Sequence, residues 1–171
     1  GAVRAMLEAG VRCPPTSSAG RWFDAAAGLL GLKEVMRYEG QAAMLLEGLA
    51  AAHGPVDPEP LVRLSDDLTL DLLPLLNRLA DTSDAGFGAA LFHSTLARAL
   101  ADWSAAAAEQ TGLTEVVLSG GCFMNRVLAT GVERHLRSRG LGVLEASELP
   151  PNDGGIAAGQ AWVALMAGME S

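Results

Sequence analysis

Two glycine-rich turns, each directly after a short apolar run, constrain the fold of this chain more than any other feature. Ser-Gly-Gly at 119–121 follows the run 116–118, and Asp-Gly-Gly at 153–155 follows the run 142–144 and a short acidic link. Each pattern predicts a strand that ends at glycines and is followed by a helix. Two strands joined by one helix form a βαβ unit with parallel strands. Both turns would then lie at the carboxyl ends of neighbouring strands, where open α/β sheets bind ligands.

The rest of the chain is dominated by apolar residues at helical spacing. The segment 61–64 is the one further strand that we predict, at the edge of the fold. The fold class is therefore a helix-rich α/β unit with a small sheet, and 171 residues fit one domain. The predicted helices cover 20–32, 41–53, 71–79 with Asp71 as its cap, 84–111 with Ser83 as its cap, and 154–167.

Composition and charge exclude several classes of partner. The net charge is −8 and the basic residues are spread thinly, so we expect no binding of nucleic acid. No apolar run approaches the roughly 18 residues that span a bilayer, so no membrane contact is expected. Cys13 and Cys122 form no C-x-x-C pair and fit a reducing cytoplasm, which is the expected location. The chain begins without methionine, and we expect it to be a piece of a longer protein.

The first glycine turn has two interpretations. A strand that ends at Gly120-Gly121 and restarts as a helix presents free backbone N–H groups to an anion, and glycine lets a ligand approach closely. Asn125 then offers a donor and an acceptor to a ribose or a base. Alternatively, the glycines only make a tight turn and Asn125 caps the helix. The spacing does not decide between the two.

The second turn adds the carboxylate of Asp153, which fits either a helix cap or a metal ligand. A single carboxylate cannot hold a metal, and the histidines do not supply the remaining ligands. His93 shares a helical face with apolar residues and is predicted to be a hydrogen-bonded core residue. His53 ends a helix, and His135 lies in a stretch that looks exposed.

The remaining candidates have mainly structural interpretations. Asp24 lies beside aromatic residues and needs a polar partner, and Glu39 precedes a helix start, where a cap is the default role. Cys122 is better explained as a small buried filler than as an activated thiol. Ser119 has no base nearby.

Five segments occur in a fixed order along the chain. They are Thr-Ser-Ser-Ala-Gly-Arg-Trp-Phe-Asp-Ala at 16–25, Tyr-Glu-Gly-Gln-Ala-Ala at 38–43, Phe-His-Ser-Thr-Leu-Ala at 92–97, Ser-Gly-Gly-Cys-Phe-Met-Asn at 119–125 and Asn-Asp-Gly-Gly-Ile-Ala-Ala-Gly-Gln at 152–160. Together they resemble the C-terminal lobe of the NiFe-hydrogenase maturation carbamoyltransferases, and the likeness runs from about Thr16 to Met166. The resemblance implies an actin/sugar-kinase/heat-shock-ATPase-like (ribonuclease H-like) fold and identifies residues 1–171 as this single lobe.

The resemblance implies a transferase that makes carbamoyl-adenylate from carbamoyl phosphate and ATP. The carbamoyl group then passes to the C-terminal cysteine of a partner maturation protein, where it becomes a cyanide ligand of the hydrogenase. The resemblance also implies one divalent metal, iron or zinc. The fragment alone is expected to be inactive, because the upstream lobe and the adenylate-forming domains are needed.

The resemblance also assigns residues by motif position. Asp24, Gly40 and, less directly, Glu39 would contact the adenosine. Gly120, Gly121 and Asn125 would form the nucleotide loop, and the metal would be bound by Asp153 together with two histidines of an H-x-x-x-H motif in the upstream lobe. Cys122 stands where the family has a small apolar residue.

Two other functions remain open at the level of sequence. The chain could be a non-catalytic lobe that docks a partner or the upstream lobe, which predicts an exposed apolar patch. It could also be half of a sugar-kinase-like phosphotransferase.

Overall fold

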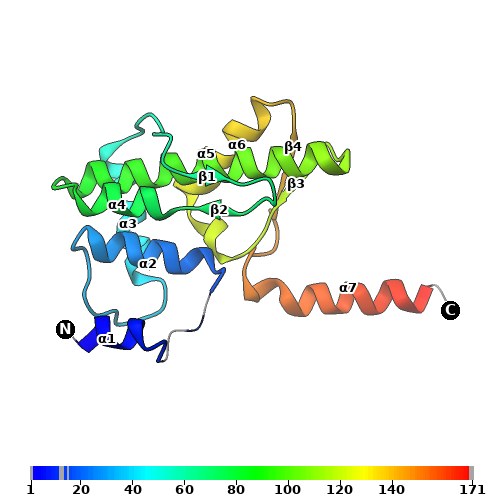
Figure 1. The fold of residues 1–171 in the computed structure, drawn as a ribbon. Helices are drawn as coiled ribbons and strands as arrows, with labels where there is room; N and C mark the ends of the chain where they lie inside the picture. Colours follow the sequence, from blue (N-terminus) through cyan, green and yellow to red (C-terminus); the bar gives the residue numbers. More distant parts are fainter. Residues whose placement is uncertain (1, 12–13, 15, 170–171) are drawn as a thin grey trace.

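The computed structural model describes residues 2–11, 14 and 16–169, so Cys13 lies outside the described residues. Helices come first and a small α/β unit follows, as predicted (Figure 1). The elements are α1 (Ala2–Glu8), α2 (Ala19–Leu29), α3 (Gln41–His53), β1 (Arg63–Leu64), β2 (Leu70–Asp71), α4 (Leu73–Ala80), α5 (Ala85–Thr111), β3 (Glu115–Leu118), the 3-10 helix η1 (Gly121–Met124), α6 (Arg126–Arg137), β4 (Gly142–Glu145), the 3-10 helix η2 (Asp153–Gly155) and α7 (Ile156–Met169).

The long helix α5 is the centre of the fold, and α3, α4 and α6 pack against it. Its start is capped by Asp84, whose Oδ1 accepts a hydrogen bond from the Phe87 N–H at 3.0 Å, so the prediction of Ser83 as the cap was wrong by one residue. Its end at the left-handed Gly112 was predicted correctly. The largest side chains of the core are fully buried: Phe23, Leu46, Leu75, Leu79, Leu91, Phe92, Leu128 and Leu136.

The short hairpin β1–β2 was only half predicted. The sequence pattern indicated the first strand, but not the second, Leu70–Asp71, which pairs with it antiparallel and of which Asp71 was predicted to cap a helix. Asp71 nevertheless accepts a hydrogen bond from the Leu73 N–H at 3.0 Å, so it supports the first turn of α4 from one residue before the cap position.

The predicted βαβ unit is confirmed. β3 and β4 pair in parallel, with Glu115 opposite Gly142 and Leu118 opposite Glu145, and η1 and α6 connect them. Both glycine turns therefore follow the carboxyl ends of adjacent strands.

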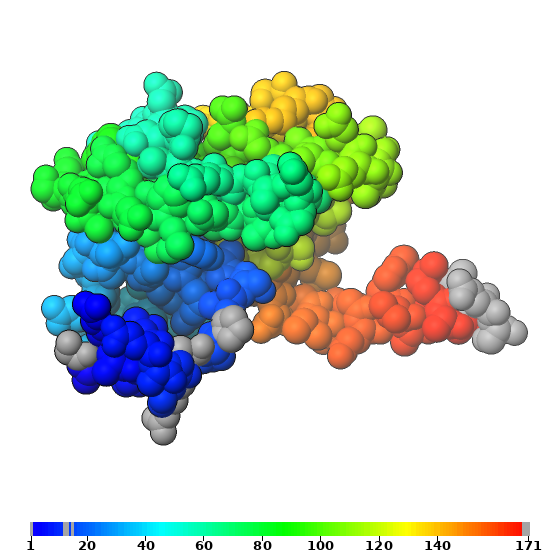
Figure 2. All heavy atoms as spheres, in the orientation of Figure 1, coloured from blue at the N-terminus to red at the C-terminus, as the bar shows by residue number. Residues whose placement is uncertain are grey.

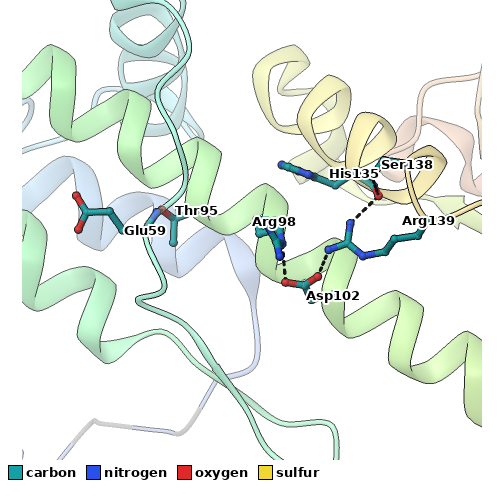
Figure 3. Close-up of polar contacts among 7 residues, drawn as sticks. All are labelled: Glu59, Thr95, Arg98, Asp102, His135, Ser138 and Arg139. Atoms are coloured by element: carbon teal, nitrogen blue, oxygen red, sulfur yellow. Dashed lines mark hydrogen bonds and ion pairs between the residues drawn. The ribbon is translucent and has the colours of Figure 1, made fainter.

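One network of polar contacts ties the end of α6 to α5 (Figure 3). Asp102 of α5 accepts from Arg98 at 2.9 Å and also binds Arg139, and Arg139 donates to the His135 carbonyl oxygen at 2.6 Å. His135 is half-buried rather than exposed, and its Nε2 is shielded from solvent without a hydrogen-bond partner among the described residues. In the same view the backbone N–H of Glu59 donates to Thr95 Oγ1 at 3.2 Å, which fixes the linker against α5.

The helix α7 extends away from the rest of the molecule (Figures 1 and 2). It contains no charged residue, and Trp162 and Leu165 are 64% and 63% exposed. Within the described residues, no helix combines the length and the hydropathy that a membrane crossing requires. The apolar surface of α7 is therefore left uncovered in this chain.

Candidate functional site

The two glycine turns lie side by side and are hydrogen-bonded to each other. The Gly120 N–H donates to the Pro151 carbonyl oxygen at 2.6 Å, and Asn152 Nδ2 lies 3.0 Å from the Met124 sulfur. Gly120 has φ 104° and ψ 158°, a backbone conformation that residues with a Cβ rarely adopt. The expectation that both turns lie at one edge is confirmed, and ligand binding at that edge stays a prediction.

The glycines of the second turn are needed for close packing. A Cβ on Gly155 would lie 2.9 Å from the Pro150 carbonyl oxygen, and one on Gly154 would lie 2.9 Å from Pro150 Cγ. Asn152 caps η2 by accepting from the Gly154 N–H at 3.0 Å, so Asp153 is not the cap. The carboxylate of Asp153 is exposed and has no hydrogen-bond or ion-pair partner among the described residues.

Asn125 caps α6, and both ends of its side-chain amide are engaged. Oδ1 accepts from the Leu128 N–H at 2.9 Å, and Nδ2 lies 2.9 Å from Nε2 of His93. Only 8% of Asn125 is exposed. The structural interpretation as a cap is thus confirmed, while contact with a nucleotide stays a prediction.

His93 is a hydrogen-bonded core residue, as predicted. Its Nδ1 lies 2.8 Å from the Ala89 carbonyl oxygen, one turn earlier on α5, and burial lowers its pKa below the usual 6.5. The imidazole edge also meets the Phe23 ring at 5.6 Å between centroids. His93 therefore connects α2, α5 and the start of α6.

Asp24 lies on α2 next to Phe23, and its carboxylate is mostly buried. Oδ2 lies 2.9 Å from Arg21 Nη2 in an ion pair, yet it accepts no hydrogen bond within the described part of the chain and is shielded from solvent. A buried carboxylate oxygen without a hydrogen bond is unfavourable, and the ion pair with Arg21 compensates for this in part.

Glu39 and Gly40 lie at the start of α3. Gly40 is in the left-handed conformation at the helix start, and Glu39 is exposed. The contact that joins α3 to the glycine-turn region comes from Glu47, whose Oε1 accepts from the Arg126 N–H at 2.7 Å. Sequence reasoning missed Glu47, because no local pattern marks a contact across 79 residues.

A groove runs between α3 and α6, with α5 as its floor. Its volume is about 320 Å³, and it begins at the residues that follow Asn125. The guanidinium groups of Arg126 and Arg134 have no ion-pair partner among the described residues, although the chain is acidic overall. The lining residues are mostly small: Ala50, Ala51, Gly54, Pro55, Ala90, His93, Ser94, Ala97, Arg126, Val127, Thr130, Gly131 and Arg134.

A smaller hollow of about 180 Å³ opens between the two strand ends, and Arg126 lines it as well. Arg126 therefore connects the groove to the edge where the glycine turns lie. Cys122, close to this hollow, is half-buried, and burial raises the pKa of its thiol. A raised pKa agrees with a filler role.

Comparison with known proteins identifies the family. Residues 1–160 match the family described as "Carbamoyltransferase, Kae1-like Domain, second subdomain". The match covers most of the chain, so the chain belongs to this family of carbamoyltransferases.

Individual relatives agree with this assignment. Carbamoyltransferase HypF2 of Cupriavidus necator is 48% identical over 95% of this chain and 24% of its own length, and carbamoyltransferase HypF of Rhizobium leguminosarum is 48% identical over 91% and 20%. The crystal structure of full-length HypF in the phosphate- and nucleotide-bound form aligns with a TM-score of 0.77 at 32% identity, over 95% of this chain and 22% of that one. HypF of T. kodakarensis aligns with a TM-score of 0.76 at 29% identity. The chain thus spans a fifth to a quarter of these proteins.

Proposed function

We propose that this chain supplies part of the nucleotide site of a carbamoyltransferase. In the proposed reaction, the carbamoyl group of carbamoyl-adenylate, made from carbamoyl phosphate and ATP, is transferred to the C-terminal cysteine of a partner protein. The product would serve the formation of the cyanide ligands of NiFe-hydrogenase. The family assignment favours this chemistry over a sugar-kinase-like phosphotransfer.

The groove between α3 and α6 is the observation that carries the proposal. Small residues line it, so a flat base can enter, and the guanidinium groups of Arg126 and Arg134 flank it and would attract the phosphate of the adenylate. The groove begins beside Asn125, at the edge where the backbone of Gly120 and Gly121 is exposed. A related full-length protein was crystallised with a nucleotide, which supports this choice of ligand.

Asp24 belongs to the adenosine end of the proposed site by its motif position, and it does not line the groove. Its Oδ2 is shielded from solvent and ion-paired with Arg21, so a ribose hydroxyl would reach it only after a local rearrangement. Gly40 is a further proposed contact of the adenosine and Glu39 a weaker one, on the helix α3, which contacts the start of α6 through Glu47.

The exposed carboxylate of Asp153 fits the role of one donated metal ligand. Among the described residues no group of three histidine, cysteine or acidic side chains could hold a metal ion, so the other ligands would come from histidines outside this chain. A bound iron or zinc would polarise the carbamoyl oxygen. This chain's own part is to present the carboxylate next to the nucleotide turn.

The transfer itself needs positioning more than activation, because a carbamoyl-adenylate is already reactive. The partner's thiolate would attack the carbamoyl carbon, a carbon–sulfur bond would form, and adenosine monophosphate would leave as the carbon–oxygen bond breaks. The nucleophile and the upstream lobe both come from outside the chain. The chain therefore holds the leaving group.

The test is calorimetric titration of the two-lobed enzyme with a non-hydrolysable carbamoyl-adenylate analogue. Asn125→Ala and Asp24→Ala should each weaken binding about tenfold, the effect expected for hydrogen bonds to a charged or polar ligand. Ala51→Trp would fill the groove from an exposed position on α3 and should weaken binding of the analogue more than either of these variants.

Ala52→Trp is the matched control for the groove, because Ala52 is also exposed on α3 but does not line the groove. It should bind the analogue as the unaltered enzyme does. If Asn125→Ala, Asp24→Ala and Ala51→Trp also bound the analogue as tightly as the unaltered enzyme, the site assignment would be refuted.

A second candidate function, a non-catalytic docking lobe, is favoured by the uncovered apolar helix α7. The Trp162 and Leu165 side chains are exposed on a helix that carries no charge, as an interface for the upstream lobe would require. The isolated chain should then self-associate in sedimentation experiments, and Leu165→Glu should reduce the association. A monomeric isolated chain would argue against this role.

A further inference from the structure

We propose that His93 is a positioning residue that fixes the side-chain amide of Asn125 in the orientation in which it meets the nucleotide. The inference rests on the proposed function, because it needs Asn125 to contact the ligand. It adds a residue that acts through Asn125 rather than by touching the reacting atoms.

The hydrogen bonds around the imidazole define its tautomer. Nδ1 lies 2.8 Å from the Ala89 carbonyl oxygen, which can only accept, so Nδ1 carries the proton. Burial lowers the pKa of His93, and the ring is therefore neutral near pH 7. Nε2 is then an acceptor, and it lies 2.9 Å from Asn125 Nδ2, which donates to it.

The acceptor on His93 and the Leu128 N–H together decide which way the amide of Asn125 points. Oδ1 accepts from the Leu128 N–H at 2.9 Å while Nδ2 donates to Nε2. Rotating the amide by half a turn would bring Oδ1 against the lone pair of Nε2 and the NH₂ group against the Leu128 N–H. Both contacts would be repulsive, so only one orientation is stable.

This orientation leaves defined groups for a ligand. An asparagine amide has two N–H donors and two oxygen lone pairs, and each of the two internal contacts uses one. One N–H and one lone pair of Asn125 remain free for a ligand. Asn125 is 8% exposed, and the next residue, Arg126, lines the groove. A ligand acceptor would meet an N–H whose direction is already set, which reduces the entropy cost of binding.

Packing alone does not require a histidine at this position. The ring contacts both Phe23 and Phe92, with centroids at 5.6 Å from each in edge-to-face geometry, and the two phenyl rings also contact each other. A phenylalanine would keep such contacts without the cost of burying a polar ring. The nitrogen at Nε2 of His93 is explained by its contact with Asn125.

Two substitutions separate positioning from packing. His93→Phe keeps the aromatic contacts and removes the acceptor, whereas His93→Gln keeps an acceptor near the place of Nε2 and removes the ring. Titration of the two-lobed enzyme with the carbamoyl-adenylate analogue should show binding weakened about fivefold or more in His93→Phe, the effect of one hydrogen bond, and near-unaltered binding in His93→Gln. The reverse order, or equal affinity of all three forms, would overturn the inference while the proposed function stands.

A spectroscopic readout tests the geometry without any ligand. Nitrogen-15 NMR of the 171-residue chain labelled at histidine should show His93 protonated at Nδ1 and unprotonated at Nε2 at pH 7. Protonation at Nε2 instead would overturn the inference. If the unaltered two-lobed enzyme fails to bind the analogue, the proposed function is refuted, and the ligand-directed role of His93 is refuted with it.

Discussion

The backbone N–H of Gly120 donates to the carbonyl oxygen of Pro151 at 2.6 Å, which joins two turns that follow different strands. The bond places the exposed Gly120 backbone and the Asp153 carboxylate on the same edge of the two-stranded parallel sheet. Neither turn therefore has to be positioned by a ligand. The edge is formed by the chain itself.

Gly120→Ala should destabilise the chain by about 1–3 kcal/mol, because φ 104° with ψ 158° lies in a region that only glycine adopts without strain. Gly140→Ala is the control, since Gly140 has the milder left-handed φ of 79° and open space around it, and should cost about 1 kcal/mol. Urea unfolding of both variants gives the comparison. Equal costs would show that the turn relaxes to accommodate the added methyl group.

Local sequence patterns predicted the elements whose causes are local. The strand–glycine–helix pattern found the βαβ unit, and Gly112 marked the end of α5. The cap of α5 was missed by one residue because Ser83 and Asp84 are both good caps, and only the Phe87 hydrogen bond distinguishes them. Strand β2 was missed because its two residues carry no periodic signal and Asp71 also fits a helix cap.

The candidate site was predictable only in part, because only some of its contacts have local causes. Motif positions placed the glycine turns and Asn125, but the Glu47–Arg126 and His93–Asn125 contacts join residues 79 and 32 positions apart, and no local pattern encodes them. The groove arises from small residues on three helices, which each look like ordinary packing positions. Tertiary packing brings them together.

Asn125→Ala should lower the free energy of unfolding by about 2–3 kcal/mol, because it removes the cap of α6 and leaves the buried His93 Nε2 without a donor. Asn152→Ala removes a cap that is less buried and belongs to a three-residue 3-10 helix, and should cost less than about 1 kcal/mol. Denaturant unfolding followed by circular dichroism measures both. A smaller loss for Asn125→Ala than for Asn152→Ala would contradict the buried network.

Stability should fall as the pH drops below about 6.5, because both His93 and His135 have lowered pKa values in the folded chain. Burial lowers the pKa of each, and nearby arginines lower that of His135 further. The unfolded chain takes up protons near pH 6.5 while the folded chain does not, so stability rises with pH in the window between the folded and unfolded pKa values. Above that window these two histidines should add no pH dependence to the stability.

The variant with His93→Gln and His135→Gln tests this assignment. Its urea midpoint should depend less on pH than that of the unaltered chain between about pH 5 and pH 7, the range in which histidine titrates. Parallel pH profiles would assign the acid sensitivity to carboxylates instead.

Gly131→Ala should destabilise the packing of α6 on α5, because a Cβ at Gly131 would lie 2.8 Å from the Cβ of Ala97. Such overpacking between two helix backbones costs about 1–3 kcal/mol. Gly48→Ala is the matched control: Gly48 is an exposed helical glycine of α3 with nothing within 4 Å, so alanine there should stabilise by about 0.5–1 kcal/mol. Opposite signs in thermal unfolding would confirm that α6 approaches α5 through Gly131. Since Gly131 also lines the groove, its alanine variant should weaken binding of the adenylate analogue, whereas the Gly48 variant should not.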